Sequence, residues 1–282
     1  MRMLGTGVPG ERGVRRIRIE PSGGAAEWLE LWAFRDLFAM LALRDIKLRY
    51  RQTALGILWV ILQPLVSSLI FALIFGVLAK LPSDGTPYLL FVFAGILPWN
   101  LFSGGLQRAG NSLIADARLI TKIYFPRAII PLASTTSVLL DFAVASVVLA
   151  ALMVFNHAPF SWQLLGLPVF IAIALAVTVG LSFFFSALNV YYRDFSYALP
   201  FIIQAWMYAS PVVYSSSLIP ERWQALYGLN PMVGVIGGFR WALLGGPLPA
   251  LAIVEAALIA TGMLLVGAWV FRRVERSFAD VV

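Results

Sequence analysis

The sequence predicts an all-α integral membrane protein with six transmembrane helices. Of the 282 residues, 60% are hydrophobic and only 12% are charged, and the mean hydropathy is +0.85. Soluble domains are about half apolar and about a quarter charged. The apolar residues also gather in six runs of roughly 20 residues, which is the length that a helix needs to cross a bilayer. Because lipid offers no hydrogen-bond partner to a free peptide group, we expect these runs to be helical.

The chain begins with two segments that are not expected to cross the membrane. Residues 1–26 are polar and rich in Gly and Pro, which predicts a disordered cytoplasmic tail. The apolar stretch 27–43 is too short to cross and is interrupted at Arg35–Asp36. Trp28 and Trp32 lie on one helical face, as interfacial anchors do. We expect a helix that lies in the inner leaflet and packs against the bundle, and membrane anchoring alone is its alternative role.

The remaining chain, together with this interfacial helix, forms one transmembrane domain, residues 27–282. The expected spans cover approximately 55–79, 87–107, 129–155, 164–190, 197–219 and 250–271. Pro64 and Pro211 lie within the first and fifth spans. The missing N–H of a proline is expected to bend each helix.

A further segment, 220–249, lies between the fifth and sixth spans. Its apolar runs are too short to cross, and Pro and Gly break them repeatedly. This pattern predicts a re-entrant or short-helix hairpin on the outer face. Arg240 and Glu221 are expected to pair there or to meet lipid headgroups.

The distribution of cations predicts the orientation of the chain. If the N-terminus is cytoplasmic, 18 of the 21 Lys and Arg residues lie in cytoplasmic segments. The outer loops then hold only Lys80, Arg222 and Arg240. This asymmetry is the positive-inside pattern, and it predicts that both termini are cytoplasmic. Nucleic-acid binding would need a folded basic surface with recognition elements, and the sequence indicates none.

Few residues inside the spans carry chemistry. Asp141 and Glu255 are the charged ones, and we favour structural roles for both. Asp141 would pair with a neighbouring helix, hydrogen-bond through Ser137 or Thr136, or be protonated. Glu255 lies near the outer end and would extend to the interface. The chain has no cysteine and one histidine, so we expect no metal site.

The second cytoplasmic loop, 108–128, carries a candidate docking site for a soluble partner. Asn111 or Ser112 would cap a short helix through Lys122, and Pro126 would end it. Apolar and basic side chains on such a helix suit docking, although an amphipathic connector has the same pattern. The candidate residues are Leu113, Ile114, Arg118, Leu119, Ile120 and Lys122.

Amides and aromatic rings in the first and fifth spans are candidates to line a path. Gln63 and Gln204 lie in the spans that contain the two prolines. Trp206, Tyr208 and Tyr214 offer rings and hydroxyls, which suit a sugar because its C–H faces pack on rings and its hydroxyls accept hydrogen bonds. Anchoring at the membrane interface and helix packing are the alternative roles of these aromatic residues.

Four segments resemble the permease subunits of polysaccharide ABC exporters of the ABC-2 type. These proteins move O-antigen, teichoic acid and related lipid-linked glycans. The segments are LALRDIKLRYRQTALGILWVILQPL at 41–65, NVYYRDFSYALPFIIQAWMYASPVVYS at 189–215, GLNPMVGVIGGFRWALLG at 228–245 and the C-terminal RRVERSFADVV. The resemblance covers roughly 28–282, in order, with a matching number of spans.

The resemblance implies a homodimeric permease that pairs with two copies of a cytoplasmic ATPase. That partner would bind ATP and Mg²⁺, so no cofactor is expected in this chain. The loop at 108–128 would be the coupling helix, the hairpin would lie near the exit, and the first and fifth spans would line the channel at the dimer interface.

The resemblance also implies an uptake site for the substrate at the inner face. An undecaprenyl-diphosphate-linked glycan would enter there from the membrane lipid. The candidate residues are Arg44, Lys47, Arg49 and Arg51, whose charge suits a diphosphate. Setting the orientation of the chain is the alternative role of all four.

The function implied is the membrane subunit of an ATP-driven exporter of O-antigen-like polysaccharide, in the bacterial inner membrane. We expect a transport subunit in lipopolysaccharide biosynthesis and no enzyme. An ABC-2 exporter of teichoic acid, capsule, lipid or drug is the nearest alternative. A membrane glycosyltransferase is more distant, because the outer loops hold only scattered Asp84, His157 and Glu221. A secondary transporter or channel would show intramembrane ion pairs or inverted repeats, and we find no internal repeat in the sequence.

Overall fold

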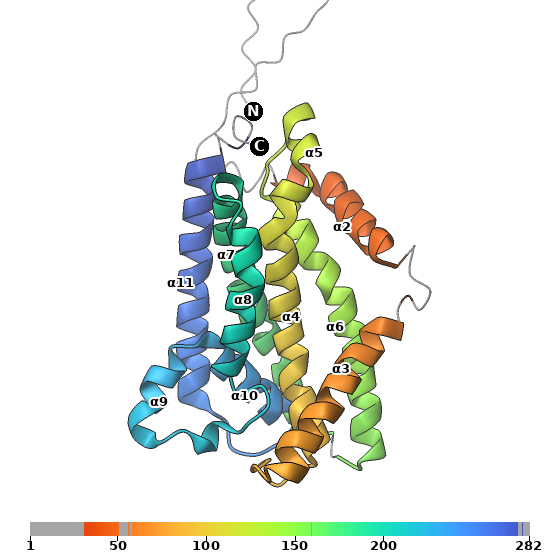
Figure 1. Ribbon diagram of the computed structural model, residues 1–282, viewed down its shortest axis with the longest axis vertical. Coiled ribbons are helices and arrows are strands. Elements are labelled where there is room, and N and C mark those ends of the chain that lie inside the picture. Colours follow the sequence, from red (N-terminus) through yellow and green to blue (C-terminus); the bar gives the residue numbers. More distant parts are fainter. Residues whose placement is uncertain (1–30, 51–55, 57, 159, 276–277, 279–282) are drawn as a thin grey trace, which may run out of the picture.

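The computed structural model describes residues 31–50, 56, 58–158, 160–275 and 278. The expected tail at 1–26, Trp28 and Arg51 lie outside these residues. Figure 1 shows one elongated bundle of helices, with α5 (Ala117–Lys122) at one end and α9 (Glu221–Gly228) at the other. We call these the α5 end and the α9 end. All regular secondary structure in the described residues is helical.

Five helices are long and apolar enough to cross a membrane, with mean hydropathies between 1.7 and 2.6. They match five of the six expected spans, and the all-α membrane fold is confirmed. The five are α3 (Leu58–Phe71) continued by the π-helix η1 (Ala72–Leu78), α4 (Tyr88–Ala115), α6 (Ile129–Phe155), the 3-10 helix η2 (Trp162–Gly166) continued by α7 (Leu167–Tyr191), and α11 (Ala250–Glu275).

The expected fifth span, 197–219, is a shorter helix than the sequence indicates. It is α8 (Phe195–Tyr208), which has 14 residues and packs against α4 and α7. The chain then turns through residues 209–215. Pro211 therefore follows the helix and does not bend it, because the residue before a proline disfavours helical geometry. Pro64 does lie inside a helix, α3.

The centre of the bundle is α7, which packs against α4 on one side and α11 on the other. Glycines allow these close approaches. A Cβ at Gly180 would lie 2.6 Å from the backbone N of Leu264, and one at Gly105 would lie 2.5 Å from Thr178 Cγ2. Small residues bring membrane helices together in this way, because packing rather than water expulsion drives their association.

Residues 31–33 are helical, and after a turn at Phe34 a longer helix extends beyond the expected end at 43. It is α2 (Arg35–Tyr50), which lies at the α5 end and packs against α6. The expected interruption at Arg35–Asp36 falls on its first residues. The basic stretch up to Tyr50 is helical because Arg, Lys and Leu are all good helix formers.

The expected short helix in 108–128 is mostly a continuation of α4. The proposed cap at Asn111 or Ser112 is wrong, because both residues lie inside α4 and donate to main-chain oxygens of the preceding turn. The helix breaks at Asp116 and only α5 follows. Pro126 comes after α5, as expected.

The expected hairpin is a pair of short helices, α9 and α10 (Pro231–Leu244), at the α9 end (Figure 1). The Asn230 side chain accepts a hydrogen bond from the Met232 N–H, and Pro231 takes the first helical position. The expectation that Arg240 pairs with Glu221 or meets headgroups is wrong. Its guanidinium donates to main-chain carbonyls inside the fold.

Candidate functional site

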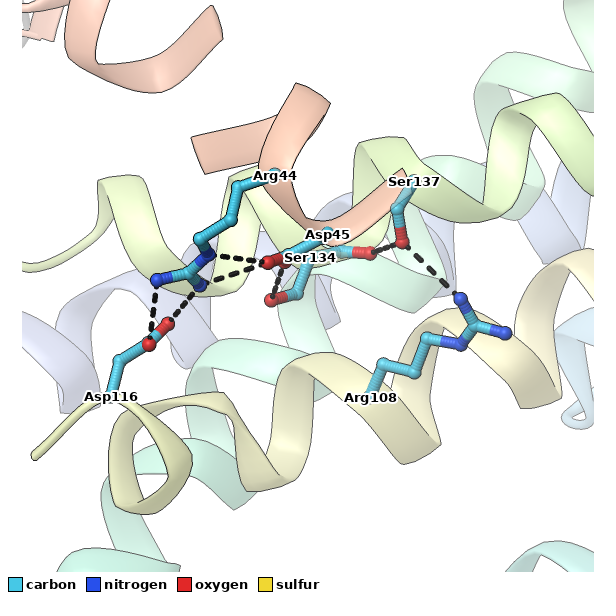
Figure 2. A network of polar contacts seen from close by, with 6 residues as sticks. All are labelled: Arg44, Asp45, Arg108, Asp116, Ser134 and Ser137. Carbon is cyan, nitrogen blue, oxygen red and sulfur yellow. Dashed lines mark hydrogen bonds and ion pairs between the residues drawn. The ribbon is translucent and has the colours of Figure 1, made fainter. Parts of the chain in front are cut away.

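At the α5 end, Arg44 of α2 forms a two-point ion pair with Asp116, the residue that separates α4 from α5 (Figure 2). The Nη1–Oδ1 distance is 2.9 Å and the Nη2–Oδ2 distance is 2.6 Å. A guanidinium and a carboxylate that meet at two points are held in a defined orientation. The hydrogen bond with Asp116 raises the pKa of Arg44 above its ordinary value. The pair ties α2 to the start of α5.

The neighbouring carboxylate extends this contact to α6. Asp45 accepts hydrogen bonds from Arg44 at 2.8 and 3.1 Å and from Ser134 Oγ at 3.1 Å. The Ser137 hydroxyl donates to the Ser134 carbonyl at 2.7 Å and lies 3.4 Å from Arg108 Nη1 (Figure 2). A continuous chain of polar contacts therefore joins α2, α4 and α6.

A second group of contacts surrounds Asp141 of α6. Arg49 forms an ion pair with its carboxylate, and Arg108 Nη2 lies 3.6 Å from it. The Tyr50 hydroxyl donates to Asp141 Oδ1 at 2.5 Å. Burial raises the pKa of Tyr50 to about 12, so this phenol keeps its proton at neutral pH. A carboxylate in a span is thus balanced by charges from two other helices, as a buried charge requires.

Three roles were expected for Asp141, and the structure shows the first: its carboxylate pairs with side chains of neighbouring helices. The sequence placed Arg108 in a loop, and the longer α4 carries it into the bundle instead. Glu255, the other charged residue in a span, packs against α9: a Cβ at Gly228 would lie 2.9 Å from its Cδ. We name the residues of the two groups the α5-end network. They are Arg44, Asp45, Arg49, Tyr50, Arg108, Asp116, Ser134, Ser137 and Asp141.

Two of the three described candidates for diphosphate binding belong to this network. Arg44 and Arg49 are paired with carboxylates. Lys47 is exposed and makes no ion pair with the described residues. It borders a groove of about 550 Å³ along α2, together with Met40 and Leu43. Arg44 lines the same groove, so Lys47 differs from it in having no carboxylate partner among the described residues.

The predicted docking residues divide into buried and accessible ones. Leu113 and Ile120 are buried in an apolar core at the α5 end, which they share with Leu41 of α2 and Phe271 of α11. This burial removes them from the surface that a partner meets. The remaining four are accessible to different degrees. Ile114 and Leu119 are half-buried, and Arg118 and Lys122 are exposed.

Two exposed residues directly after α5 extend the accessible surface. Ile123 is 58% exposed and Tyr124 is 53% exposed. These two residues were not among the docking candidates that the sequence indicated, because they follow the end of the short helix expected there. Large apolar side chains on an exposed turn were the available signal. We call Arg118, Lys122, Ile123 and Tyr124 the α5 surface.

Three of the five predicted path-lining residues lie together near the α9 end. Gln204 Nε2 lies 3.4 Å from the Tyr208 hydroxyl, and the Tyr214 hydroxyl donates to the Tyr208 carbonyl at 3.2 Å. Tyr208 is 63% exposed. Gln63 is exposed on α3 and makes no hydrogen bond with the other described residues of this group. Gln204, Tyr208 and Tyr214 thus form one hydrogen-bonded group on α8 and on residues 209–215, which we call the return segment.

The remaining one, Trp206, is a packing residue. Its ring makes an edge contact with Phe102 at 5.2 Å, and its Nε1 donates to Asn230 Oδ1 at 2.9 Å. It also borders a cavity of about 600 Å³ beside Trp223 and Tyr227 of α9. Trp206 therefore joins α8 to α4 and to the hairpin.

A bundle of membrane-length helices, with an ion-paired helix at one end and a two-helix hairpin at the other, defines a multi-pass membrane protein. Residues 36–244 match the ABC-2 type transporter family, and the chain belongs to this family. It is 32% identical to the O-antigen export system permease protein RfbA of Klebsiella pneumoniae, over 88% of this chain and 95% of that protein. The RfbA protein of Myxococcus xanthus is 30% identical over 90% of this chain and 98% of its own length. The polysialic acid transport protein KpsM of Escherichia coli is 22% identical over 84% of this chain and 93% of its own length.

Proposed function

We propose that this chain is the membrane subunit of an ATP-driven exporter of lipid-linked, O-antigen-like polysaccharide in the bacterial inner membrane. The main support is that it aligns over almost its whole length with permeases named for O-antigen export. The weaker similarity to a polysialic acid transport protein favours O-antigen over capsule as the substrate class. ATP and Mg²⁺ belong to a separate cytoplasmic ATPase in this proposal.

The proposed docking site for that ATPase is the α5 surface. It combines exposed apolar and basic side chains at one end of the bundle. The positive-inside rule supports a cytoplasmic α5 end and cytoplasmic termini, since the neighbouring segments carry Arg118, Lys122, Arg127, Arg193, Arg272 and Arg273. Two copies of this chain would associate with two ATPase subunits.

The Arg44–Asp116 pair supports a direct mechanical role for the α5-end network. A motion imposed on α5 by closure of the ATPase reaches α2 through this ion pair. It reaches α6 through Asp45 and Ser134. The network therefore converts movement at the surface into movement of helices inside the membrane.

The proposed substrate route begins beside α2 and ends at the α9 end. Lys47 would attract the diphosphate of an undecaprenyl-linked glycan from the inner leaflet. Farther along, the sugar would pass Gln204, Tyr208 and Tyr214. Gln63 on α3 would belong to the same path if two copies meet across these faces.

Co-expression with a candidate ABC-type ATPase from the same organism tests the proposal. We expect the two proteins to co-purify, and we expect ATP hydrolysis by the complex to respond to an undecaprenyl-diphosphate-linked glycan. A strain that lacks its own O-antigen permease should regain surface polysaccharide when it receives the pair. A complex that assembles but transports only free lipid or a drug would favour the alternative ABC-2 exporters.

A further inference from the structure

Arg240 of α10 donates to three main-chain carbonyls from other parts of the chain. Its Nη2 lies 2.9 Å from Val212 O, its Nη1 lies 3.1 Å from Tyr214 O, and its Nε lies 3.4 Å from Phe91 O. The guanidinium carbon is also 3.5 Å from the centroid of the Phe91 ring. Arginine presents five N–H donors in a rigid plane, so one side chain can serve several acceptors at once.

Two of the three acceptors, the carbonyls of Val212 and Tyr214, belong to the return segment 209–215, which follows α8, and the third, Phe91 O, belongs to α4. This segment has no regular helix, so its carbonyls lack the partners that a continuing helix would provide. The Asp84 carboxylate also holds the end of this segment, because it accepts a hydrogen bond from Ser215 Oγ at 2.7 Å. Among the described residues no carboxylate forms an ion pair with Arg240, and its charge is directed at carbonyl dipoles.

The return segment in turn positions two of the candidate path residues. The Tyr214 hydroxyl donates to the Tyr208 carbonyl at 3.2 Å, and the Tyr227 hydroxyl donates to the Tyr214 hydroxyl at 3.0 Å. Burial raises the pKa of Tyr227 above its ordinary value, so it stays a donor. A line of hydrogen bonds through the main chain and the side chain of Tyr214 therefore runs from Arg240 to the main-chain carbonyl of Tyr208.

We propose that Arg240 is a positioning residue for polysaccharide passage, which holds the return segment so that Tyr208 and Tyr214 present rings and hydroxyls to pyranose units at the α9 end. This inference rests on the proposed function. Lysine at position 240 keeps the charge but cannot reach three carbonyls with a planar fork. Glutamine removes the charge as well.

The test uses the complex with its ATPase and compares Arg240→Lys and Arg240→Gln with matched changes at Arg222. Arg222 is an exposed cation on α9 with no part in the hydrogen-bond line. Since hydrogen bonds to a charged donor are lost, we expect polysaccharide export to fall by roughly tenfold in the Arg240 variants while the complex still assembles. The Arg222→Lys and Arg222→Gln variants should export as the parent does.

A second readout follows the return segment itself. The chain has no cysteine, so Ala209→Cys introduces a single exposed label site in the segment. We expect Arg240→Gln to raise the rate of maleimide labelling at position 209 severalfold and Arg222→Gln to leave it unchanged.

The results separate the inference from the proposed function. If the parent complex exports no polysaccharide, the proposed function fails. If the parent exports and both Arg240 variants export equally well, only the inference fails. Loss of assembly in both Arg240 variants would also overturn it, because the residue would then be needed only for folding.

Discussion

Arg44 pairs at two points with Asp116, 72 positions later in the chain, at the residue where α4 ends and α5 begins. The Arg44 side chain is 37% exposed and that of Asp116 is 17% exposed, so solvent screens the pair only partly. Beneath it, Leu41 of α2 and Ile120 of α5 share one apolar core. The ion pair and the shared core together connect α2 to α5.

Removing either partner of this pair should uncouple ATP hydrolysis from export. We expect Arg44→Ala and Asp116→Ala each to destabilise the permease by about 1–3 kcal/mol, because the charged group left behind loses its hydrogen bonds. The double variant should be little worse than either single one, since contacting residues are not additive. Thermal unfolding of the purified complex and an export assay measure the two effects.

The control for these single and double variants is the Arg35–Asp36 pair of the same helix. Its side chains are 62% and 97% exposed and lie 3.9 Å apart, so its loss should have almost no effect. Fully additive losses for Arg44→Ala and Asp116→Ala would show that the two residues act independently.

Asp141→Asn should destabilise the bundle more than any exposed charge change. The substitution leaves Arg49 and Arg108 facing each other without a carboxylate between them. Removing one partner of a buried ion pair costs about 3 kcal/mol. A thermal-shift measurement in detergent compares this variant with Asp36→Asn, and equal melting temperatures would contradict the structural role of Asp141.

Partial recovery of stability in a double variant provides a second check on the contacts around Asp141. The double variant Asp141→Asn with Arg49→Gln removes one of the two unbalanced cations. We expect this double variant to recover part of the lost melting temperature, because only one guanidinium then remains uncompensated.

Gly180→Leu should separate α7 from α11. A Cβ alone would already lie 2.6 Å from the Leu264 backbone N, so a larger side chain forces the helices apart. Overpacking of this kind costs about 1–3 kcal/mol. Gly262→Leu is the matched control, since a Cβ there meets nothing within 4 Å. Yield and melting temperature should fall only for Gly180→Leu.

Ile123→Asp should abolish co-purification with the ATPase, because it places a carboxylate in the middle of the α5 surface. Leu218→Asp is the control, since Leu218 is 45% exposed and lies next to the hairpin, at the α9 end. The permease alone should fold equally well in both variants. Retention of the ATPase by the Ile123→Asp permease would move the docking site elsewhere.

Local composition predicted the elements of this fold well. Five of the six spans appear as membrane-length helices, and the third has the expected ends, 129 and 155. The hairpin at 220–249 also appears as two short helices. These features depend on apolar run length and on Pro and Gly positions, which are properties of contiguous sequence.

The candidate site was predicted less completely, because its residues acquire their roles from distant partners. The basic stretch before the first span was noticeable as a charge cluster, but nothing local indicated that Arg44 and Arg49 would be paired while Lys47 stays accessible. Arg240 was expected at the outer surface because the apolar runs around it are too short to form a span. Its carbonyl partners come from segments 26 to 149 positions away, which local sequence does not indicate.

The chain alone therefore determined the environment, the helices and the family of this protein, since a bilayer accepts only long apolar helices and sorts their ends by charge. Tertiary packing decided how far α4 extends, which charges are paired and which docking residues are accessible. The physical reason is that ion pairs and close helix contacts form between residues far apart in sequence, so each depends on where another helix lies.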